Sequence, residues 1–388
     1  MLPISQTRAD LPLPAPEALA HSRRLAEHVR AEIAAAGGRI SFARYMELAL
    51  YAPGFGYYSA GARKFGAAGD FVTAPELSPL FSRCLARQCA EVLGRLGGGS
   101  ILELGAGSGV MAADILAELA HLRALPEHYL ILEVSADLRE RQRALLGERV
   151  PHLMPRVQWL DALPDGHAGV MLGNEVLDAL PVQRFRKTAQ GYAEFFVEAA
   201  GEALRGTWVP VDAEFGAALA DLEAALPAPF AAGYESEFCA LMPPFLATLA
   251  ASLARGALLF LDYGYPRAAY YHPERSMGTL MCHYRQRAHA DPFLHPGLQD
   301  ITAHVDFTAV AEHATAAGLP FAGYTTQAHF LMALGIAEMS EGDMRLAQQV
   351  KLLTLPEEMG ERFKAIAFTK GLDLPLSGFA LRDLSRQL

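Results

Sequence analysis

Cysteine is scarce in this sequence: the chain has 388 residues and four cysteines. No two of them have the C-x-x-C spacing, which argues against both a zinc site and a thioredoxin-type redox motif. Scattered cysteines in a chain of this length are more typical of reduced, buried side chains than of a disulfide framework. The four residues are Cys84, Cys89, Cys239 and Cys282.

Basic residues and long apolar runs are also scarce. Lys and Arg number 33 against 43 Asp and Glu, and this excess of acid argues against binding nucleic acid through a basic surface. No apolar run is long enough to span a bilayer, and the N-terminus lacks the basic flank and apolar run of a signal peptide. We therefore expect a soluble, cytoplasmic protein with no nucleic-acid partner and no membrane insertion.

Hydrophobic residues are plentiful, at 52% of the chain, so a large core is expected. The length suits one large α/β domain with insertions, or two domains. Alternating apolar residues over 182–211 predict an antiparallel excursion, and helices are expected near 214–226 and 236–254. Composition leaves the oligomeric state open.

A glycine-rich turn lies between an apolar strand and a helix at residues 100–114, SILELGAGSGVMAAD. Such a turn directs backbone N–H groups at a ligand, and glycine permits positive φ and close approach. The spacing here is G-x-G-x-G, not the G-x-G-x-x-G of dinucleotide sites. An acid stands two places before the first glycine, and it favours S-adenosylmethionine over a pyrophosphate. The residues concerned are Glu103, Gly105, Ala106, Gly107 and Gly109; the alternative is that these glycines serve packing alone.

Two later strand ends fit an adenosine. Glu133 ends the apolar strand over 129–134, where an acid hydrogen-bonds ribose hydroxyls in this kind of unit. The alternative for Glu133 is a helix-capping or surface acid. The short strand over 157–160 leads into Asp161, Ala162 and Leu163, where a polar group can reach the exocyclic amine of adenine.

A pair of carboxylates follows the next apolar strand, which covers 169–173. Ligands bind outside the carboxyl ends of strands in open α/β sheets, so Glu175 and Asp178 are expected on the active face. They are three residues apart and share one side if the turn is helical. The alternative is that they complement a helix dipole.

Turn formers and aromatic residues are dense over 52–58 and 69–81. Two interpretations stay open: a solvated loop, or a lid that folds over the glycine turn and covers the ligand. A third loop, over 291–307, holds His295, Asp300 and other polar residues, but it lacks a recognised metal-ligand spacing. We therefore expect no metal site.

Several motifs together resemble the MidA-type family of class I S-adenosylmethionine-dependent methyltransferases. This family includes a mitochondrial complex I assembly factor that methylates an arginine. The resemblance covers roughly residues 38–370 and is most specific in the expected lid and in GNEVLDALP. The motifs are ELGAGSG, ISFARYMELALYAPGFGYYS, GDFVTAPELSPLF, GNEVLDALPV, FLDYG and DITAHVDF.

The resemblance implies an α/β fold: a Rossmann-like sheet of seven strands with helices on both faces. It implies an N-terminal leader with helices and lid at 1–80, a methyltransferase domain at 81–388, and an insertion at about 182–256. The methyl donor would be S-adenosyl-L-methionine and the partner a protein whose arginine is methylated. Gly105, Gly107 and Gly109 would hold the methionine part of the donor and Glu133 its ribose. Asn174, Thr73 and Pro75 complete the expected binding set.

Glu175 and Asp178 would then bind the guanidinium of the acceptor, since carboxylates hold it bidentately. One alternative is a methyltransferase that acts on a small molecule, and another is a non-catalytic assembly factor that binds S-adenosylmethionine. A dinucleotide oxidoreductase fits the glycine spacing least.

Overall fold

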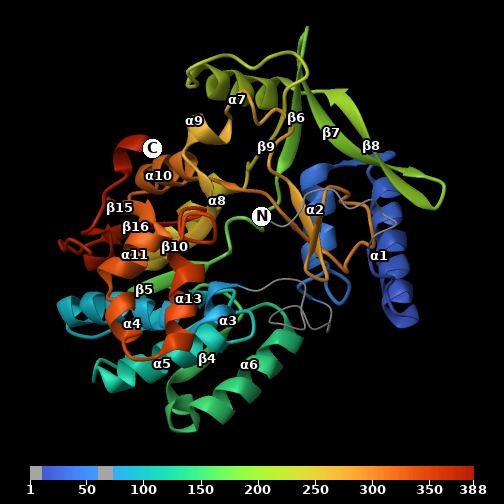
Figure 1. The fold of residues 1–388 in the computed structure, drawn as a ribbon. Coiled ribbons are helices and arrows are strands. Elements are labelled where there is room, and N and C mark those ends of the chain that lie inside the picture. Colours follow the sequence, from blue (N-terminus) through green and yellow to red (C-terminus); the bar gives the residue numbers. More distant parts are fainter. Residues whose placement is uncertain (1–10, 60–72) are drawn as a thin grey trace.

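The central feature of the fold is a mixed β-sheet covered by helices on both faces (Figure 1). The computed structural model describes residues 11–59 and 73–388, so the expected lid residues 69–72 lie outside this part. The strand order along the sheet is β15-β16-β10-β5-β2-β3-β4, and the two-residue β14 pairs with β10. The expected α/β fold is therefore confirmed. The strands are β2 (Ser100–Leu104), β3 (Tyr129–Leu132), β4 (Val157–Leu160), β5 (His167–Asn174), β10 (Leu253–Tyr265), β14 (Val305–Asp306), β15 (Phe321–Thr326) and β16 (Phe363–Lys370).

Alternation along each strand sends side chains to two separate cores. Ile101 packs in the core beneath α4 (Pro79–Leu96) and α5 (Val110–His121). Its neighbour Leu102 packs in the core beneath α8 (Met242–Ser252) and α10 (Phe307–Ala316). The inner strands are buried on both faces, as parallel strands between helical layers must be. The other helices are α6 (Ala136–Arg149), α9 (Arg267–Tyr270), α11 (Gln327–Ala333), α12 (Ile336–Met339) and α13 (Met344–Thr354), with 3₁₀ turns at Pro151–Arg156, Ser377–Phe379 and Ser385–Gln387.

A second sheet joins the N-terminal residues to the insertion after β5. Strand β1 (Arg39–Ser41) pairs antiparallel with β7, with Ile40 opposite Val197. In Figure 1 this sheet and α1 (Pro16–Ala35) lie on the opposite side of the molecule from α4 and α5. The two parts that the sequence analysis separated, 1–80 and the insertion, thus share one sheet. The insertion contains β6 (Gln183–Thr188), β7 (Gly191–Ala200), β8 (Ala203–Pro210), α7 (Ala213–Ala224) and β9 (Glu235–Phe238).

The helix expected over 236–254 is shorter than predicted, because its first residues form β9. Glu235–Phe238 pairs antiparallel with β6, with Gln183 opposite Phe238. Helix α8 then begins at Met242, with proline in its first turn, where the missing N–H has no partner to lose. A helical period alone did not distinguish these residues from a short buried strand.

Helix α2 (Phe42–Tyr51) connects the second sheet to a small third sheet. Its N-cap is Ser41, whose side chain accepts a hydrogen bond from the Arg44 amide, a role that serine commonly has at this position. The buried face of α2 packs in a cluster that also holds Val197 and Ile301. The third sheet has the order β12-β11-β13. Its strands are β11 (Met281–Tyr284), β12 (Arg287–His289) and β13 (Asp300–Thr302).

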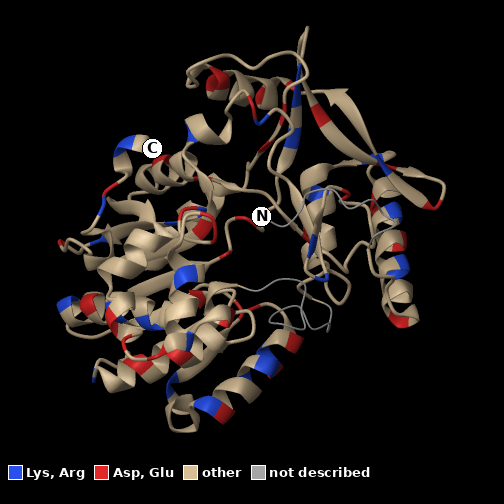
Figure 2. Cartoon of the chain, in the orientation of Figure 1, with Lys and Arg blue, Asp and Glu red and all other residues tan. Residues whose placement is uncertain are grey.

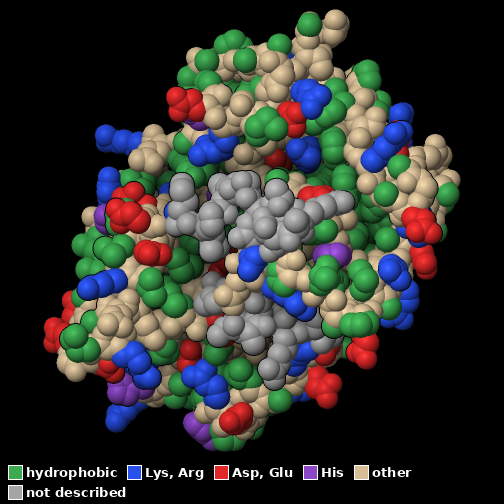
Figure 3. All heavy atoms as spheres, turned by 45° about the vertical axis from the view of Figure 1, so that its right-hand side comes forward, with side chains coloured by type: hydrophobic (Ala, Val, Ile, Leu, Met, Phe, Trp, Pro, Cys, Tyr) green, Lys and Arg blue, Asp and Glu red, His purple; other side chains and the backbone are tan. Residues whose placement is uncertain are grey.

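Charges of both signs are interspersed on the surface. Figure 2 shows Lys and Arg alternating with Asp and Glu along α1 and α6. Figure 3 shows basic, acidic and hydrophobic side chains mixed on the face that it presents. Within residues 11–59 and 73–388, no helix combines the length and the apolar character that crossing a bilayer requires.

Candidate functional site

The carboxyl ends of three core strands are aligned at one edge of the sheet. Leu104, the last residue of β2, lies opposite Leu132 on β3 and Gly173 on β5. The glycine turn, Glu133 and the acids after β5 therefore follow from neighbouring strand ends, where open α/β sheets bind ligands.

The glycine turn has the backbone conformation that the sequence predicted. Gly105, Gly107 and Gly109 have φ values of +66°, +54° and +86°, which favour glycine. A β-carbon at Gly109 would approach within 3.2 Å of Gln142, and one at Gly105 would lie 3.8 Å from the Val176 side chain. The turn thus passes close to α6 on one side and to the segment after β5 on the other.

Gln142, on α6, links the glycine turn to two neighbouring strands. Its side-chain amide donates hydrogen bonds to the Gly107 carbonyl at 2.9 Å and to Glu133 Oε2 at 3.1 Å. Its Oε1 accepts a hydrogen bond from the Trp159 indole at 2.8 Å. Glu133 Oε1 accepts a hydrogen bond from the Ser135 amide. The predicted ribose-binding acid is therefore buried in a fixed orientation beside the turn, and no sequence motif marked Gln142.

Asp161 lies at the end of β4 and is largely exposed, with an ion pair to Arg139 at 2.7 Å. Arg139 also donates hydrogen bonds to the carbonyls of Glu133 and Leu160, which ties the ends of β3 and β4 together. Ala162 is exposed and Leu163 is half-buried. The structure therefore places the predicted adenine-binding segment next to Glu133, at the solvent side of the same edge.

Glu103 lies inside the sheet, not on the open side of the turn. Its side chain is buried, and Oε2 accepts a hydrogen bond from the Tyr129 hydroxyl at 2.7 Å. Burial raises the pKa of Glu103 to about 7, although the Tyr129 hydrogen bond opposes the rise. A contact between Glu103 and the donor stays a prediction.

Glu175 and Asp178 lie in a tight turn that a third acid organises. Asp262, on β10, accepts hydrogen bonds on Oδ2 from the amides of Val176, Leu177 and Asp178. Glu175 has a φ of +53°, which is unusual for a residue with a side chain. The sequence analysis did not single out Asp262, which lies near the carboxyl end of β10, although the rule applied to Glu133 would have found it.

Among the acids of this turn, Asp178 and Asp262 are buried and Glu175 is half-buried. Glu175, Asp178 and Asp262 have no ion pair with a Lys, Arg or His of the described residues. Burial, then the charge of Asp178, raises the pKa of Glu175 to about 8. Burial raises the pKa of Asp178 to about 6 against an opposing interaction with the Tyr263 hydroxyl. Carboxyl groups held this way attract a cation.

Two side-chain oxygens at these acids have no hydrogen-bond partner in the described part of the chain. They are Oδ1 of Asp178, whose side chain is buried, and Oδ1 of Asn174. Asn174, the last residue of β5, donates its side-chain amide to Glu175 Oε1 at 3.1 Å. Buried acceptors without partners are rare in folded proteins and indicate a place for a ligand or water.

Thr73 and Pro75 belong to the short helix α3 (Ala74–Leu77), which lies against both sides of the site. Thr73 is its N-cap residue and Pro75 is buried in its first turn. The Ala74 amide interacts with the Glu175 carboxyl, and Glu76 accepts a hydrogen bond from the Ser108 hydroxyl of the glycine turn. Helix α3 therefore spans from the turn to the acids, which is where a lid was expected.

The aromatic residues before α3 also reach the acids. Tyr58 donates its hydroxyl to Asp300 Oδ1 at 3.0 Å, and Tyr51 donates its hydroxyl to the Ala179 carbonyl at 2.9 Å. The rings of Tyr51 and Tyr58 stack, with centroids 5.6 Å apart. The sequence indicated that these aromatics cover something, but it did not pair them with Asp300.

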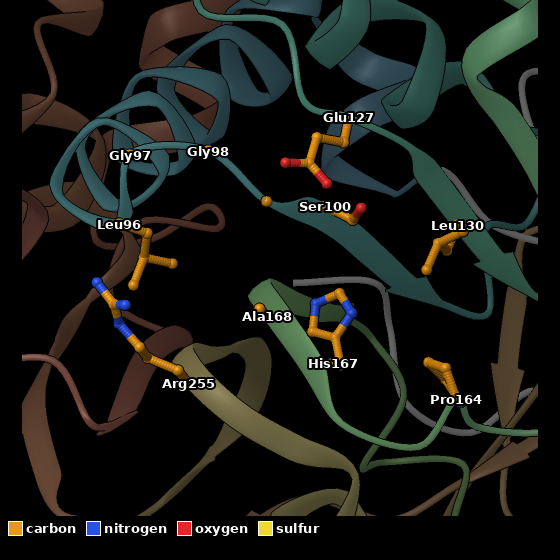
Figure 4. A pocket seen from close by; sticks show the side chains of 11 residues that line it. Leu96, Gly97, Gly98, Ser100, Glu127, Leu130, Pro164, His167, Ala168 and Arg255 are labelled. Carbon is orange, nitrogen blue, oxygen red and sulfur yellow. The ribbon is translucent and has the colours of Figure 1, made fainter.

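A cavity of about 400 Å³ lies at the opposite end of the strands (Figure 4). Ser100 and His167, which begin β2 and β5, line it together with Glu127 and Arg255. It therefore opens at the amino ends of the strands, away from the glycine turn, and we do not assign the chemistry to it.

Comparison with known proteins identifies relatives for this arrangement. Residues 84–325 match a family model described as S-adenosyl-L-methionine-dependent methyltransferase. The protein arginine methyltransferase NDUFAF7 of Danio rerio is 29% identical, over 88% of this chain and 86% of that protein. The same protein of Homo sapiens is 28% identical, over 85% of this chain and 80% of that protein. Both relatives are named as mitochondrial.

Two solved structures from Burkholderia thailandensis are more similar. One, bound to S-adenosyl-homocysteine, has a TM-score of 0.93 and 48% sequence identity, and covers 98% of this chain and 100% of the other. The second has a TM-score of 0.89 and 46% identity with the same coverage.

Proposed function

Because this chain belongs to the family of S-adenosyl-L-methionine-dependent methyltransferases, we propose that it transfers the methyl group to the guanidinium of a protein arginine. The observation that carries the acceptor class is the group formed by half-buried Glu175 and buried Asp178 and Asp262, which has no compensating cation among the described residues. Relatives named as protein arginine methyltransferases support the same acceptor. The cytoplasmic location expected from the sequence stays a prediction.

The cofactor of this methyltransferase is S-adenosyl-L-methionine, and the residues at the edge of the sheet fit it. The glycine turn has the positive φ values that leave its backbone accessible. Glu133 presents a buried carboxylate for two vicinal hydroxyls, with Gln142 and Ser135 holding its orientation. We propose that these residues hold the donor, with α3 covering it.

When bound, S-adenosyl-L-methionine supplies an electrophilic methyl group for an in-line displacement. The protein's own contribution is to align the acceptor nitrogen and to keep water out. Asp178 and Glu175 would accept N–H groups of the guanidinium, which localises its positive charge away from the attacking nitrogen. The incoming cation favours the ionised forms of these acids, so the raised pKa of each would fall when acceptor binds.

The experiment that tests this function uses a methyl-labelled donor and a cell lysate, with mass spectrometry to locate the methylated residue. We expect labelled arginine in a protein fraction. Asp178→Asn and Glu175→Gln should keep donor affinity within a few-fold and lower transfer by about 10²–10⁴, the range for loss of a positioned catalytic group. Asp165→Asn, at an exposed acid in the loop before β5, serves as the control with unchanged transfer.

Two outcomes would contradict the proposal. Label confined to small molecules would favour a small-molecule acceptor. Full transfer by both amide variants would show that the acceptor does not need these charges.

A further inference from the structure

The cavity at the amino ends of the strands is lined by residues from four neighbouring strand starts (Figure 4). Arg255 lies opposite Ala168 where β10 pairs with β5. A β-carbon at Gly99, just before β2, would be 2.7 Å from the Ala168 carbonyl oxygen. The Gly99 carbonyl in turn accepts a hydrogen bond from the Glu127 amide at 2.8 Å. These four residues therefore form one row across the amino ends of the sheet.

Arg255 and Glu127 are the two ends of this row, and they carry opposite charges. The strands follow each other in the order β10-β5-β2-β3. Neighbouring strands are about 4.8 Å apart, so the backbones of Arg255 and Glu127 are separated by roughly 14 Å. Neither side chain has an ion pair or a hydrogen bond with another residue of 11–59 or 73–388. Both are exposed, and Figure 4 shows them on different sides of one hollow.

His167, the first residue of β5, adds a buried polar side chain to the wall of the cavity. Its side chain is 5% exposed, and Nε2 lies 3.3 Å from the Val170 carbonyl oxygen. Burial lowers the pKa of His167, so the ring is neutral near pH 7. With Nε2 donating to Val170, Nδ1 is left as an acceptor, and no group in the described part of the chain donates to it.

The glycine before Gly99 keeps the space beside Glu127 open. Gly98 has a φ of +138°, and a β-carbon there would lie 3.1 Å from Glu127 Oε1. The cavity volume of about 400 Å³ falls within the range of small-molecule sites, about 300–1,000 Å³. A small ligand therefore has room to pair with the groups at both ends of the row.

We propose that this cavity binds a small zwitterion of the amino-acid type, with its carboxylate on Arg255 and its ammonium on Glu127 and His167. A guanidinium binds a carboxylate bidentately, and an ammonium has three N–H donors for carboxylate and imidazole acceptors. A ligand with a single charge would satisfy one end of the row and leave the other unpaired. The inference does not depend on the methyl acceptor, because the cavity lies at the opposite end of the strands from the glycine turn.

The test follows the backbone amide NMR signals of the full chain during titration with 4-aminobutyrate, butyrate and butylamine. We expect 4-aminobutyrate to bind at least about ten-fold more tightly than either singly charged probe, because only the zwitterion makes both charged contacts. The largest shifts should be those of Gly98 and Gly99. Arg255→Gln should lower the affinity for 4-aminobutyrate to about that for butylamine, and Glu127→Gln should lower it to about that for butyrate.

The matched controls are Arg382→Gln and Glu214→Gln, which remove one charge of each sign from exposed residues outside the cavity. Both should bind 4-aminobutyrate as the parent protein does. Three results would overturn the inference: no preference for 4-aminobutyrate in the parent protein, an unchanged affinity in either cavity variant, or amide shifts centred outside the cavity.

Discussion

At the scale of single residues, a buried carboxyl group makes the free energy of unfolding depend on pH. Glu103 is buried, and its carboxyl group accepts a hydrogen bond from the Tyr129 hydroxyl. Its pKa is about 7 in the folded protein against an ordinary value of 4.5. The folded state therefore holds this proton to a higher pH than the unfolded state does. The stability from this group is full below pH 4.5 and is lost as pH rises through 7.

We predict that Glu103→Gln makes the protein less sensitive to alkaline pH. The amide keeps an acceptor for Tyr129 and cannot ionise. Between pH 6 and pH 8.5, the free energy of unfolding of the parent protein should fall by about 1–2 kcal/mol more than that of the variant. Urea unfolding at the two pH values measures this difference. The control is Glu214→Gln, at an exposed residue. If the free energy of unfolding falls equally in Glu103→Gln and in the parent protein, Glu103 is not the group that titrates.

A second residue, Gln142, is expected to position the cofactor site without being visible in the sequence. Gln142→Leu keeps the size of the side chain but leaves Glu133, the Gly107 carbonyl and the Trp159 indole without their shared partner. Affinity for S-adenosyl-homocysteine should fall about 10- to 100-fold, because unpaired buried polar groups and a loosened carboxylate each cost about 1–3 kcal/mol.

Isothermal titration measures this affinity. Trp159→Phe removes one donor of the network and should weaken binding only a few-fold. Normal binding by a folded Gln142→Leu protein would mean that Glu133 keeps its orientation alone.

At the scale of elements, strand ends were predictable and the contacts between distant elements were not. Strands β2, β3 and β5 could be predicted from apolar runs that end at a glycine or an acid. Burial on both faces gives parallel strands such a continuous apolar pattern. Gln142 lies in a polar helix with no such pattern. Ala303, just after β13, donates its amide to the Asp178 carbonyl across more than a hundred residues of chain, and no local spacing encodes that contact.

Helix α3 is the element whose role can be tested most directly. It contacts the glycine turn through Glu76 and Ser108, and it contacts Glu175 through the Ala74 amide. If α3 acts as a lid, Ser108→Ala should speed the release of S-adenosyl-homocysteine about ten-fold with little change in the binding rate, because the hydrogen bond is made only when the lid is closed. Stopped-flow displacement measures both rates.

The control for this element is Ser340→Ala, which removes a serine hydroxyl bonded to the Ala337 carbonyl at a distant helix end. It should leave both rates as they are. Equal release rates for Ser108→Ala and the parent protein would mean that α3 does not gate the cofactor.

At the scale of the whole molecule, the residues expected to bind the cofactor and those expected near the acceptor are positioned by different sheets. The glycine turn and Glu133 follow strands of the central sheet. Tyr51 and Tyr58 depend on α2, which is held by the sheet that combines β1 with the insertion. A destabilising substitution in α2 or in the second sheet should therefore lower methyl transfer more than it lowers donor affinity.

Phe42 offers the test of this division. It is fully buried at the start of α2, with ring contacts to Tyr45 and Phe195, and Arg184 lies over its ring. Phe42→Ala should lower the free energy of unfolding by about 3–5 kcal/mol, because it leaves a cavity where α2 meets the insertion. In the folded fraction, methyl transfer should fall at least about ten-fold while donor affinity stays within a few-fold, since Tyr51 and Tyr58 lose their support.

The comparison variant is Phe330→Ala, which leaves a cavity of the same kind beneath the central sheet, next to Phe379. It should destabilise the protein by a similar amount but preserve transfer per folded molecule. A loss of donor affinity in Phe42→Ala equal to its loss of transfer would mean that the two layers act as one unit. In that case, the acceptor site could not be changed independently of the cofactor site, and substitutions in α2 would have to be interpreted through both.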